Sequence, residues 1–233
     1  MKKTLFAAAI FAAASVNSFG AACTSFNGQS LATAFPTLAS GCEIGSGATL
    51  WRLSNLWIET SLGTGVPNMT TSNLLVNFQE VANGFSVTYS TTGGFAFAPP
   101  QASTWKNGMW ITGIGGPSAD NNITGVTASY IDPSGGVNFS FRKQIQDQLG
   151  STLAPLIVID NFSSGFTTSG TASGSFGSSL SINDTVVFDA GKTSGGSITS
   201  YTNTFTTAIP EPMSFLLMGV GLVGIAALRR RSS

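Results

Sequence analysis

The fold is decided by residues 74–90, whose sequence is LLVNFQEVANGFSVTYS. Apolar and polar side chains alternate on either side of Asn83-Gly84, which is the period of a half-buried strand. Asn-Gly is also the strongest two-residue hairpin signal. A turn at Asn83-Gly84 pairs Phe78 with Tyr89, and both strands then agree on which face is apolar. That face carries Leu74, Val76, Phe78, Phe85, Val87 and Tyr89.

Strand patterns continue beyond this hairpin. A second Asn-Gly pair, Asn107-Gly108, predicts a hairpin in which Trp105 faces Trp110. Residues 156–159 are apolar on both faces and predict a central strand, and short strands separated by Gly, Asn and Pro turns indicate an all-β antiparallel sandwich or jelly-roll-like domain. Further strands are expected at 126–131, 137–142, 180–182, 185–188 and 198–205, a short helix at 143–149, and a surface loop at 167–179.

The composition excludes several classes of function. Only 9% of the 233 residues are charged, well below the roughly 25% of typical soluble proteins. Between the terminal segments five basic residues stand against nine acidic ones, a net charge near −4, so we expect no nucleic acid partner. The chain has no histidine, which removes the usual general base, Ser-His-Asp catalysis and His-ligated zinc. We therefore expect no enzymatic activity, no cofactor and no metal centre.

The N-terminal residues 1–22 have the three parts of a secretory signal peptide. These are Lys2 and Lys3, an apolar run at 5–16, and small residues at 20–22. One alternative is a short buried helix. Another is a lipoprotein site with its lipid on Cys23, although Gly20 stands where such a site needs a larger aliphatic residue. Signal peptidase is accordingly an expected processing partner.

The C-terminal segment also has three parts, in a fixed order. They are Pro210-Glu211-Pro212, an apolar run at 213–228, and the basic cluster Arg229, Arg230 and Arg231. The run rises about 1.5 Å per residue and so reaches about 24 Å, enough for a short transmembrane helix. The arginines would hold its end in the cytoplasm. The prolines prevent the helix from extending backwards and leave an exposed peptide for a protease at the membrane's outer face.

This order of features closely resembles the PEP-CTERM sorting signal of Gram-negative bacteria. The resemblance implies processing by an exosortase, a membrane cysteine protease, and a link to exopolysaccharide and biofilm production. It also implies transient inner-membrane anchoring before the chain reaches the cell surface or extracellular matrix. The alternative is a simple membrane anchor. We expect a signal peptide at 1–22, a β-sandwich domain at 23–205, and a linker with the sorting signal at 206–233.

Cys23 and Cys42 are the cysteines of the chain, 19 positions apart. In an oxidising compartment they predict a disulfide that closes the N-terminal loop and contributes about 3 kcal/mol. Metal binding by two isolated cysteines is the weaker alternative. The stretch Cys42-Glu43-Ile44-Gly45, followed by a Trp- and Leu-rich segment, also resembles the N-terminal region of several PEP-CTERM proteins.

The four tryptophans are the candidate carbohydrate-binding residues. Trp51 and Trp57 are six positions apart and would share one face of a strand. Together with Trp105 and Trp110 they would form a flat aromatic platform for sugar rings. The interpretation that we favour is that these tryptophans fill the sandwich core.

Acidic and amide side chains offer two weaker candidate sites. Glu80 falls on the apolar face of the first hairpin, where a buried carboxyl group would suit general-acid chemistry. It could equally lie at an edge, or pair with Arg52 or Arg142. Asp120-Asn121-Asn122 and Asp132 offer oxygen ligands for calcium, although Asp and Asn are common in turns without a metal.

Three functional hypotheses follow. The leading one is a non-enzymatic structural or adhesive component of the extracellular matrix, associated with exopolysaccharide or biofilm. The alternative is a carbohydrate-binding module, and the third is a glycan-active enzyme that uses Glu80 with Asp160. An exposed aromatic row on one sheet would favour the module, and two carboxylates about 5–10 Å apart in a cleft would favour the enzyme.

Overall fold

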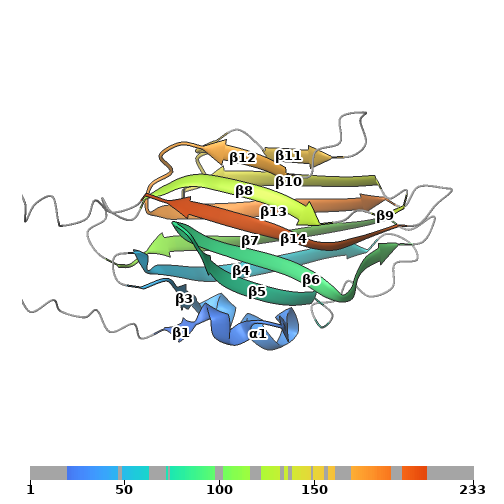
Figure 1. The fold of residues 1–233 in the computed structure, drawn as a ribbon, viewed down its shortest axis with the longest axis horizontal. Helices are drawn as coiled ribbons and strands as arrows, with labels where there is room; N and C mark the ends of the chain where they lie inside the picture. The colour runs from blue at the N-terminus through green and yellow to red at the C-terminus, as the bar shows by residue number, and fades with distance from the viewer. Residues whose placement is uncertain are drawn as a thin grey trace, which may run out of the picture.

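Two sheets packed face to face make up the fold (Figure 1). Sheet A has the strand order β1-β3-β4-β7-β13-β10-β11, and sheet B has the order β12-β8-β14-β6-β5-β2, with β9 paired to β14. Among the described residues all pairings are antiparallel except that of β1 with β3. The predicted all-β antiparallel sandwich is confirmed. The computed structural model describes residues 20–46, 49–62, 72, 74–97, 102–115, 122–131, 134–135, 138–147, 149–154, 157–160, 169–189 and 196–208.

The chain passes back and forth between the two sheets. Sheet A consists of Ala21–Ala22 (β1), Cys42–Ile44 (β3), Trp51–Leu62 (β4), Ala102–Gly113 (β7), Asn138–Gln146 (β10), Ile157–Asp160 (β11) and Ser179–Asp189 (β13). Sheet B consists of Gln29–Ser30 (β2), Leu74–Val81 (β5), Gly84–Phe97 (β6), Ile123–Ile131 (β8), Ser134–Gly135 (β9), Ser169–Ser173 (β12) and Gly196–Thr207 (β14). The helical elements are the 3-10 turn Cys23–Phe26 (η1) and the helix Leu31–Ser40 (α1).

The inner faces of the sheets form one apolar core. The six side chains predicted to share a face of the β5–β6 hairpin are all buried in it. The register differs from the prediction, because Val81 pairs with Gly84 and the turn is Ala82-Asn83, with Asn83 at a left-handed φ of 63°. A shift of two residues leaves every side chain on its predicted face, since the side-chain period of a strand is two.

Gly84 lies at the start of β6, where β14 passes very close to the backbone. A Cβ at this position would lie 1.9 Å from the carbonyl oxygen of Phe205. Only glycine therefore permits the β6–β14 pairing at this point.

Two polar pairs that resemble turns lie in the middle of strands. β7 continues through Asn107-Gly108, so the hairpin predicted there is wrong, and Trp105 and Trp110 lie on the same strand. β13 continues through Asn183-Asp184, where two separate strands were expected. Asn107 and Asp184 are register partners across β7 and β13. Both errors therefore fall at one place in sheet A.

Three smaller predictions also need correction. The helix expected at 143–149 is wrong, because Lys143 and Ile145 are core residues of β10. β11, expected to be central, lies at the edge of sheet A in the described part of the chain. β12 occupies part of the loop expected at 167–179.

The N-terminal segment covers one edge of the sandwich. Helix α1 places Leu31, Ala34 and Leu38 in the core and packs on β4 and β5. This helix precedes the strand-like part of the sequence and was not predicted.

Candidate functional site

The outer face of sheet A carries two exposed tryptophans. Trp57 on β4 is 39% exposed and Trp110 on β7 is 37% exposed. Trp57 pairs with Gly108, two residues before Trp110. The two indoles are therefore diagonal neighbours across β4 and β7, a placement that lies within reach of large aromatic side chains. Large apolar side chains gathered on one exposed face indicate a binding surface.

A bulge in β4 brings Trp57 to this face. The β4–β7 register shifts between Ser54 and Trp57, where Asn55 has a φ of 50°. The additional residue reverses the alternation of inward and outward side chains. Trp51 consequently points inward, is 1% exposed, and has its ring centroid 6.1 Å from that of Phe85. The prediction that Trp51 and Trp57 share a face is wrong, and Trp51 is a core residue.

Gly108 lies directly beneath the Trp57 ring. A Cβ on Gly108 would lie 2.2 Å from Trp57 Nε1 and 2.8 Å from Asn183 Oδ1. The indole therefore lies over the β7 backbone and beside the Asn183 amide. Asn183 Nδ2 donates to Gln146 Oε1 at 2.7 Å, which fixes the orientation of this amide. We call this surface the tryptophan face and define it by Trp57, Gly108, Trp110, Gln146 and Asn183.

Ion pairs border the tryptophan face. Lys106 Nζ lies 3.5 Å from Glu59 Oε2, and both side chains are largely exposed. Arg52 donates to Glu43 Oε1 at 2.6 Å, and Glu43 is buried beneath it. Arg52 is thus engaged by Glu43 rather than by Glu80. Trp105 lies on β7 opposite Val186 in the register, and its side chain lies outside the described residues.

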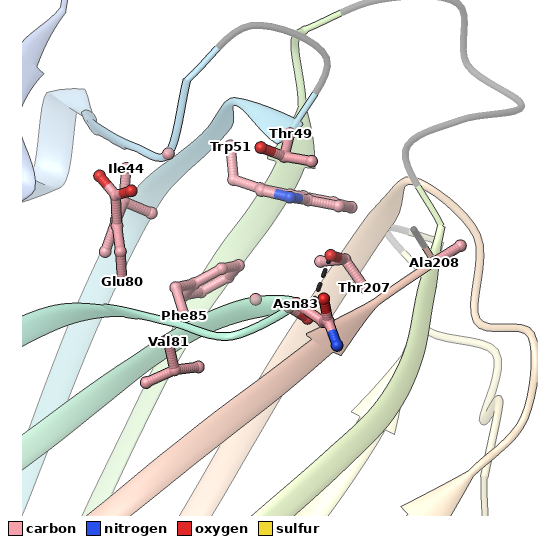
Figure 2. Close-up of a pocket in the computed structure, with 11 residues that line it drawn as sticks. Ile44, Thr49, Trp51, Glu80, Val81, Asn83, Phe85, Thr207 and Ala208 are labelled. Carbon is pink, nitrogen blue, oxygen red and sulfur yellow. Dashed lines mark hydrogen bonds between the residues drawn. The ribbon is translucent and has the colours of Figure 1, made fainter. Parts of the chain in front are cut away.

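A pocket of about 170 Å³ opens at one end of the sandwich (Figure 2). The Trp51 ring forms one wall, and its buried Nε1 has no hydrogen-bond partner among the residues that the structure describes. Thr207 Oγ1 donates to the Asn83 carbonyl at 3.2 Å on the opposite wall. Glu80 also lines this pocket and is exposed, so it lies at an edge, as the alternative interpretation held.

The structure does not bring Glu80 and Asp160 together. β5 packs near β3, whereas β11 packs near β12 at the other side of the sandwich. The side chain of Asp160 lies outside the described residues. The carboxylate pair of the enzyme hypothesis therefore gains no support from the arrangement of the strands.

The calcium candidates lie mostly outside the described residues, as Asp120, Asn121 and Asp132 do. Asn122 is described, and its Oδ1 accepts a hydrogen bond from the Gly177 amide at 2.8 Å. Within the described ranges no group of three or more His, Cys, Asp or Glu side chains could hold a metal ion.

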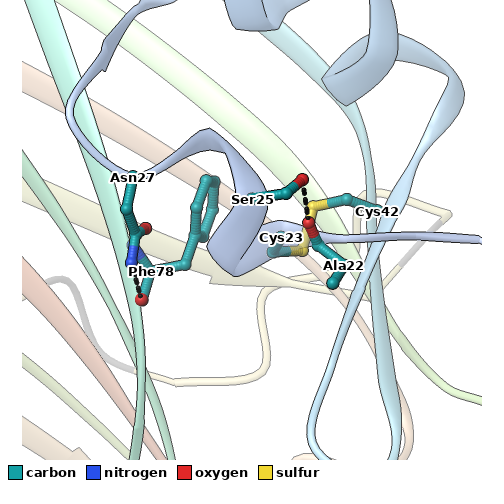
Figure 3. Close-up of a disulfide and its surroundings, with 6 residues drawn as sticks. All are labelled: Ala22, Cys23, Ser25, Asn27, Cys42 and Phe78. Atoms are coloured by element: carbon teal, nitrogen blue, oxygen red, sulfur yellow. Dashed lines mark hydrogen bonds between the residues drawn. A yellow bond between two sulfur atoms is a disulfide. The ribbon is translucent and has the colours of Figure 1, made fainter.

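The predicted disulfide between Cys23 and Cys42 is present (Figure 3). It attaches η1 to β3, and both cysteines are buried. Asn27 attaches the same segment to β5, because its Nδ2 donates to the Phe78 carbonyl at 2.9 Å and its Oδ1 accepts from the Phe78 amide at 2.6 Å. The N-terminal segment is therefore linked to both sheets.

A buried polar cluster lies between the sheets. Lys143 Nζ donates to Asp184 Oδ1 at 2.5 Å, and Asn203 Nδ2 donates to Asp184 Oδ2 at 2.6 Å. Both side chains of the Lys143–Asp184 pair are fully buried. Beside them Asn107 Nδ2 donates to the Tyr201 hydroxyl. None of these was a predicted site residue, because isolated polar residues within alternating strands resemble turns.

Burial also shifts the titration of this cluster. It lowers the pKa of the Lys143 amine, and the nearby Asp184 only partly offsets this effect. Burial likewise raises the pKa of the Tyr201 hydroxyl well above its usual value, and it raises the pKa of the Tyr89 hydroxyl as well.

The C-terminal segment carries a recognised sorting signal. Residues 208–231 match the PEP-CTERM protein-sorting motif. The match confirms the predicted motif. It implies an exported protein with a C-terminal sorting region and an exosortase as processing partner. Pro210, Glu211, Pro212 and the three terminal arginines lie outside the described residues, as does the predicted membrane helix. Within the described part of the chain, no helix is long and apolar enough to span a membrane.

Comparison with solved structures finds distant structural relatives. No curated protein sequence matches the chain. The mannan-recognising carbohydrate-binding module TmCBM27 is 13% identical over 69% of this chain and 89% of its own, with a TM-score of 0.31. The xylan-binding domain CBM22-1 of Paenibacillus barcinonensis Xyn10C is 13% identical over 64% and 87%, with a TM-score of 0.21. The enzymatically active domain of bacteriophage CBA120 tailspike protein 4 is 12% identical over 69% and 19%, with a TM-score of 0.24.

Proposed function

We propose that this chain is an exported, non-enzymatic component of the cell surface or extracellular matrix, and that it binds polysaccharide through the tryptophan face. The observation that carries the proposal is the exposed diagonal pair Trp57 and Trp110 on the outer face of sheet A. An exposed aromatic pair on one sheet supports a carbohydrate-binding surface over an inert matrix domain. The adhesive role then follows from glycan binding.

The chemistry of the face suits a sugar chain. The apolar face of a sugar ring can stack on an indole, and tryptophan contributes large contact area at binding surfaces. The Asn183 and Gln146 amides lie beside the indoles and can exchange hydrogen bonds with sugar hydroxyls. The low charge of the chain favours a neutral or weakly charged glycan.

The sorting motif supports the same setting. An exosortase substrate leaves the inner membrane after cleavage, so the domain would meet exopolysaccharide outside the cell. Signal peptidase would remove residues 1–22 first. The destination we propose is the surface or matrix of a Gram-negative bacterium.

A glycan array with the purified chain tests the proposal. We expect binding to a restricted group of polysaccharides, with the signal abolished in the Trp57→Ala/Trp110→Ala double variant. An array on which the folded chain binds no glycan would contradict it. Concentration-dependent self-association that disappears in the same double variant would instead identify the face as a contact between copies.

A further inference from the structure

We propose that Lys143 and Asn203 become joined by an intramolecular isopeptide bond, with Asp184 as the catalytic residue. The bond would connect β10 of sheet A to β14 of sheet B through the core. This modification is independent of glycan binding by the tryptophan face.

The two reacting groups are hydrogen-bonded to the two carboxylate oxygens of Asp184. Asp184 Oδ1 accepts from Lys143 Nζ at 2.5 Å, and Asp184 Oδ2 accepts from Asn203 Nδ2 at 2.6 Å. Lys143 and Asp184 are register partners within sheet A, whereas Asn203 reaches them from the opposite sheet. An amine, a carboxamide and a proton-relaying acid are therefore assembled at one point. Because the fold already holds these groups together, the reaction does not have to bring separate reactants into contact, which lowers its barrier.

The surroundings favour reaction over solvation. All three residues are buried, and the Phe141 and Phe205 rings lie 5.5 and 6.0 Å from Lys143 Nζ. Water is thereby kept from the reacting atoms. Burial also lowers the pKa of the Lys143 amine, which favours the neutral, nucleophilic form.

The amide of Asn203 is incompletely satisfied in the unreacted arrangement. Its Oδ1 is buried and has no hydrogen-bond partner in the described part of the chain. An unpaired buried carbonyl carries a desolvation cost.

The reaction balances without an oxidant or an external co-reactant. Lys143 first passes a proton to Asp184, and the free Nζ lone pair attacks Asn203 Cγ. The new Nζ–Cγ bond forms, and Nζ gives up a second proton. Asp184 delivers its first proton to Nδ2, the Cγ–Nδ2 bond breaks, and Nδ2 leaves as ammonia. The second proton from Nζ stays on the Asp184 carboxyl group. The product is a secondary amide, and the chain is lighter by one ammonia.

The position of the bond suits an exported adhesive protein. β14 ends at Thr207, directly before the sorting segment 208–231. A covalent link from β14 to β10 would carry tension from the C-terminal end into the other sheet. Such a link needs no energy source outside the cell once the domain has folded.

Peptide mapping of the full chain purified from the exporting cells tests this inference, whatever the processing at either end. Trypsin does not cleave after an acylated lysine, so we expect the peptide 143–192 joined to the peptide that begins at Thr193, lighter than their sum by one ammonia. Fragmentation should place the link between Lys143 and Asn203. The separate, unmodified peptides 144–192 and Thr193 onwards would overturn the inference and leave an ordinary buried ion pair. A link to Asp184 with loss of water would overturn the choice of acceptor.

Variants identify the role of Asp184. Asp184→Asn keeps the shape of the side chain but removes the acid, so the branched peptide should disappear while circular dichroism still reports a folded chain. Thr204→Ala is the matched control, because it lies beside Asn203 on the other face of β14 and should retain the link in full. A branched peptide undiminished in Asp184→Asn would exclude Asp184 as the catalyst. If that variant fails to fold, the wild-type peptide map alone decides whether the bond exists.

Discussion

Single residues decide where the aromatic side chains of sheet A lie. Asn55, at a φ of 50°, occupies the β-bulge that places Trp57 outside and Trp51 inside. Asn tolerates left-handed backbone more readily than most other residues, so the side-chain chemistry fits the bulge. Gly108 then leaves room for the indole to lie on the strand beside it. The tryptophan face therefore depends on Asn55 and Gly108 as much as on the tryptophans.

Substitution of Gly108 tests this dependence. In Gly108→Ala the new methyl carbon would lie 2.2 Å from Trp57 Nε1, so the indole must move off β7. Glycan affinity should fall several-fold, whereas the midpoint of thermal unfolding should change little, because the site is at the surface. Thr204→Ala is the control, because Thr204 lies on β14 in the other sheet. Equal affinity in Gly108→Ala and wild type would show that the position of Trp57 is unimportant.

At the scale of elements, the strands with regular alternation could be predicted and those with buried polar residues could not. The β5–β6 hairpin follows its hydrophobic pattern, and even a wrong turn position leaves its faces correct. Asn107-Gly108 and Asn183-Asp184 have turn chemistry, yet contacts across the core hold them in strands. Such long-range contacts are invisible to local sequence patterns, and local rules tend to fail at functional sites. For the same reason the sequence predicts that the tryptophans are candidate binding residues but does not predict the bulge in β4 that exposes Trp57.

The N-terminal elements depend on the disulfide. Cys23→Ser/Cys42→Ser should lower the free energy of unfolding by about 3 kcal/mol, because the open loop gains entropy in the unfolded chain. Denaturant titration with and without reductant would measure the loss. The double variant should be insensitive to reductant. A wild-type chain that is equally insensitive, or that yields free thiols when denatured without reductant, would contradict a structural disulfide.

At the scale of the whole molecule, the buried tyrosines predict loss of stability at alkaline pH. Tyr89 and Tyr201 have pKa values raised above their usual 10.0, so they ionise more readily in the unfolded chain. Their contribution is complete below pH 10 and declines as pH rises further. A free Lys143 amine acts oppositely, because its lowered pKa favours the unfolded chain below 10.5. Denaturant midpoints should therefore fall above pH 10, and phenolate absorbance from a chain that remains fully folded would contradict the assignment.

The sorting segment governs where the whole molecule goes. Deletion of 209–233 should remove the chain from the membrane-processing route and yield periplasmic or prematurely secreted protein. In the wild type, mass spectrometry should find a mature C-terminus that precedes Ser233. Mature wild-type protein that still ends at Ser233 would exclude cleavage and favour a simple anchor.

Calorimetric titration with exopolysaccharide isolated from the exporting cells measures directly whether the tryptophan face binds polysaccharide. Wild type and the control Thr204→Ala, which changes a side chain of β14 in the other sheet, should bind with equal affinity. Trp57→Ala/Trp110→Ala should bind at least about tenfold more weakly, equivalent to about 1.4 kcal/mol, with an unchanged melting temperature. Equal affinity in the double variant, or no binding by the wild type, would contradict polysaccharide binding by the tryptophan face.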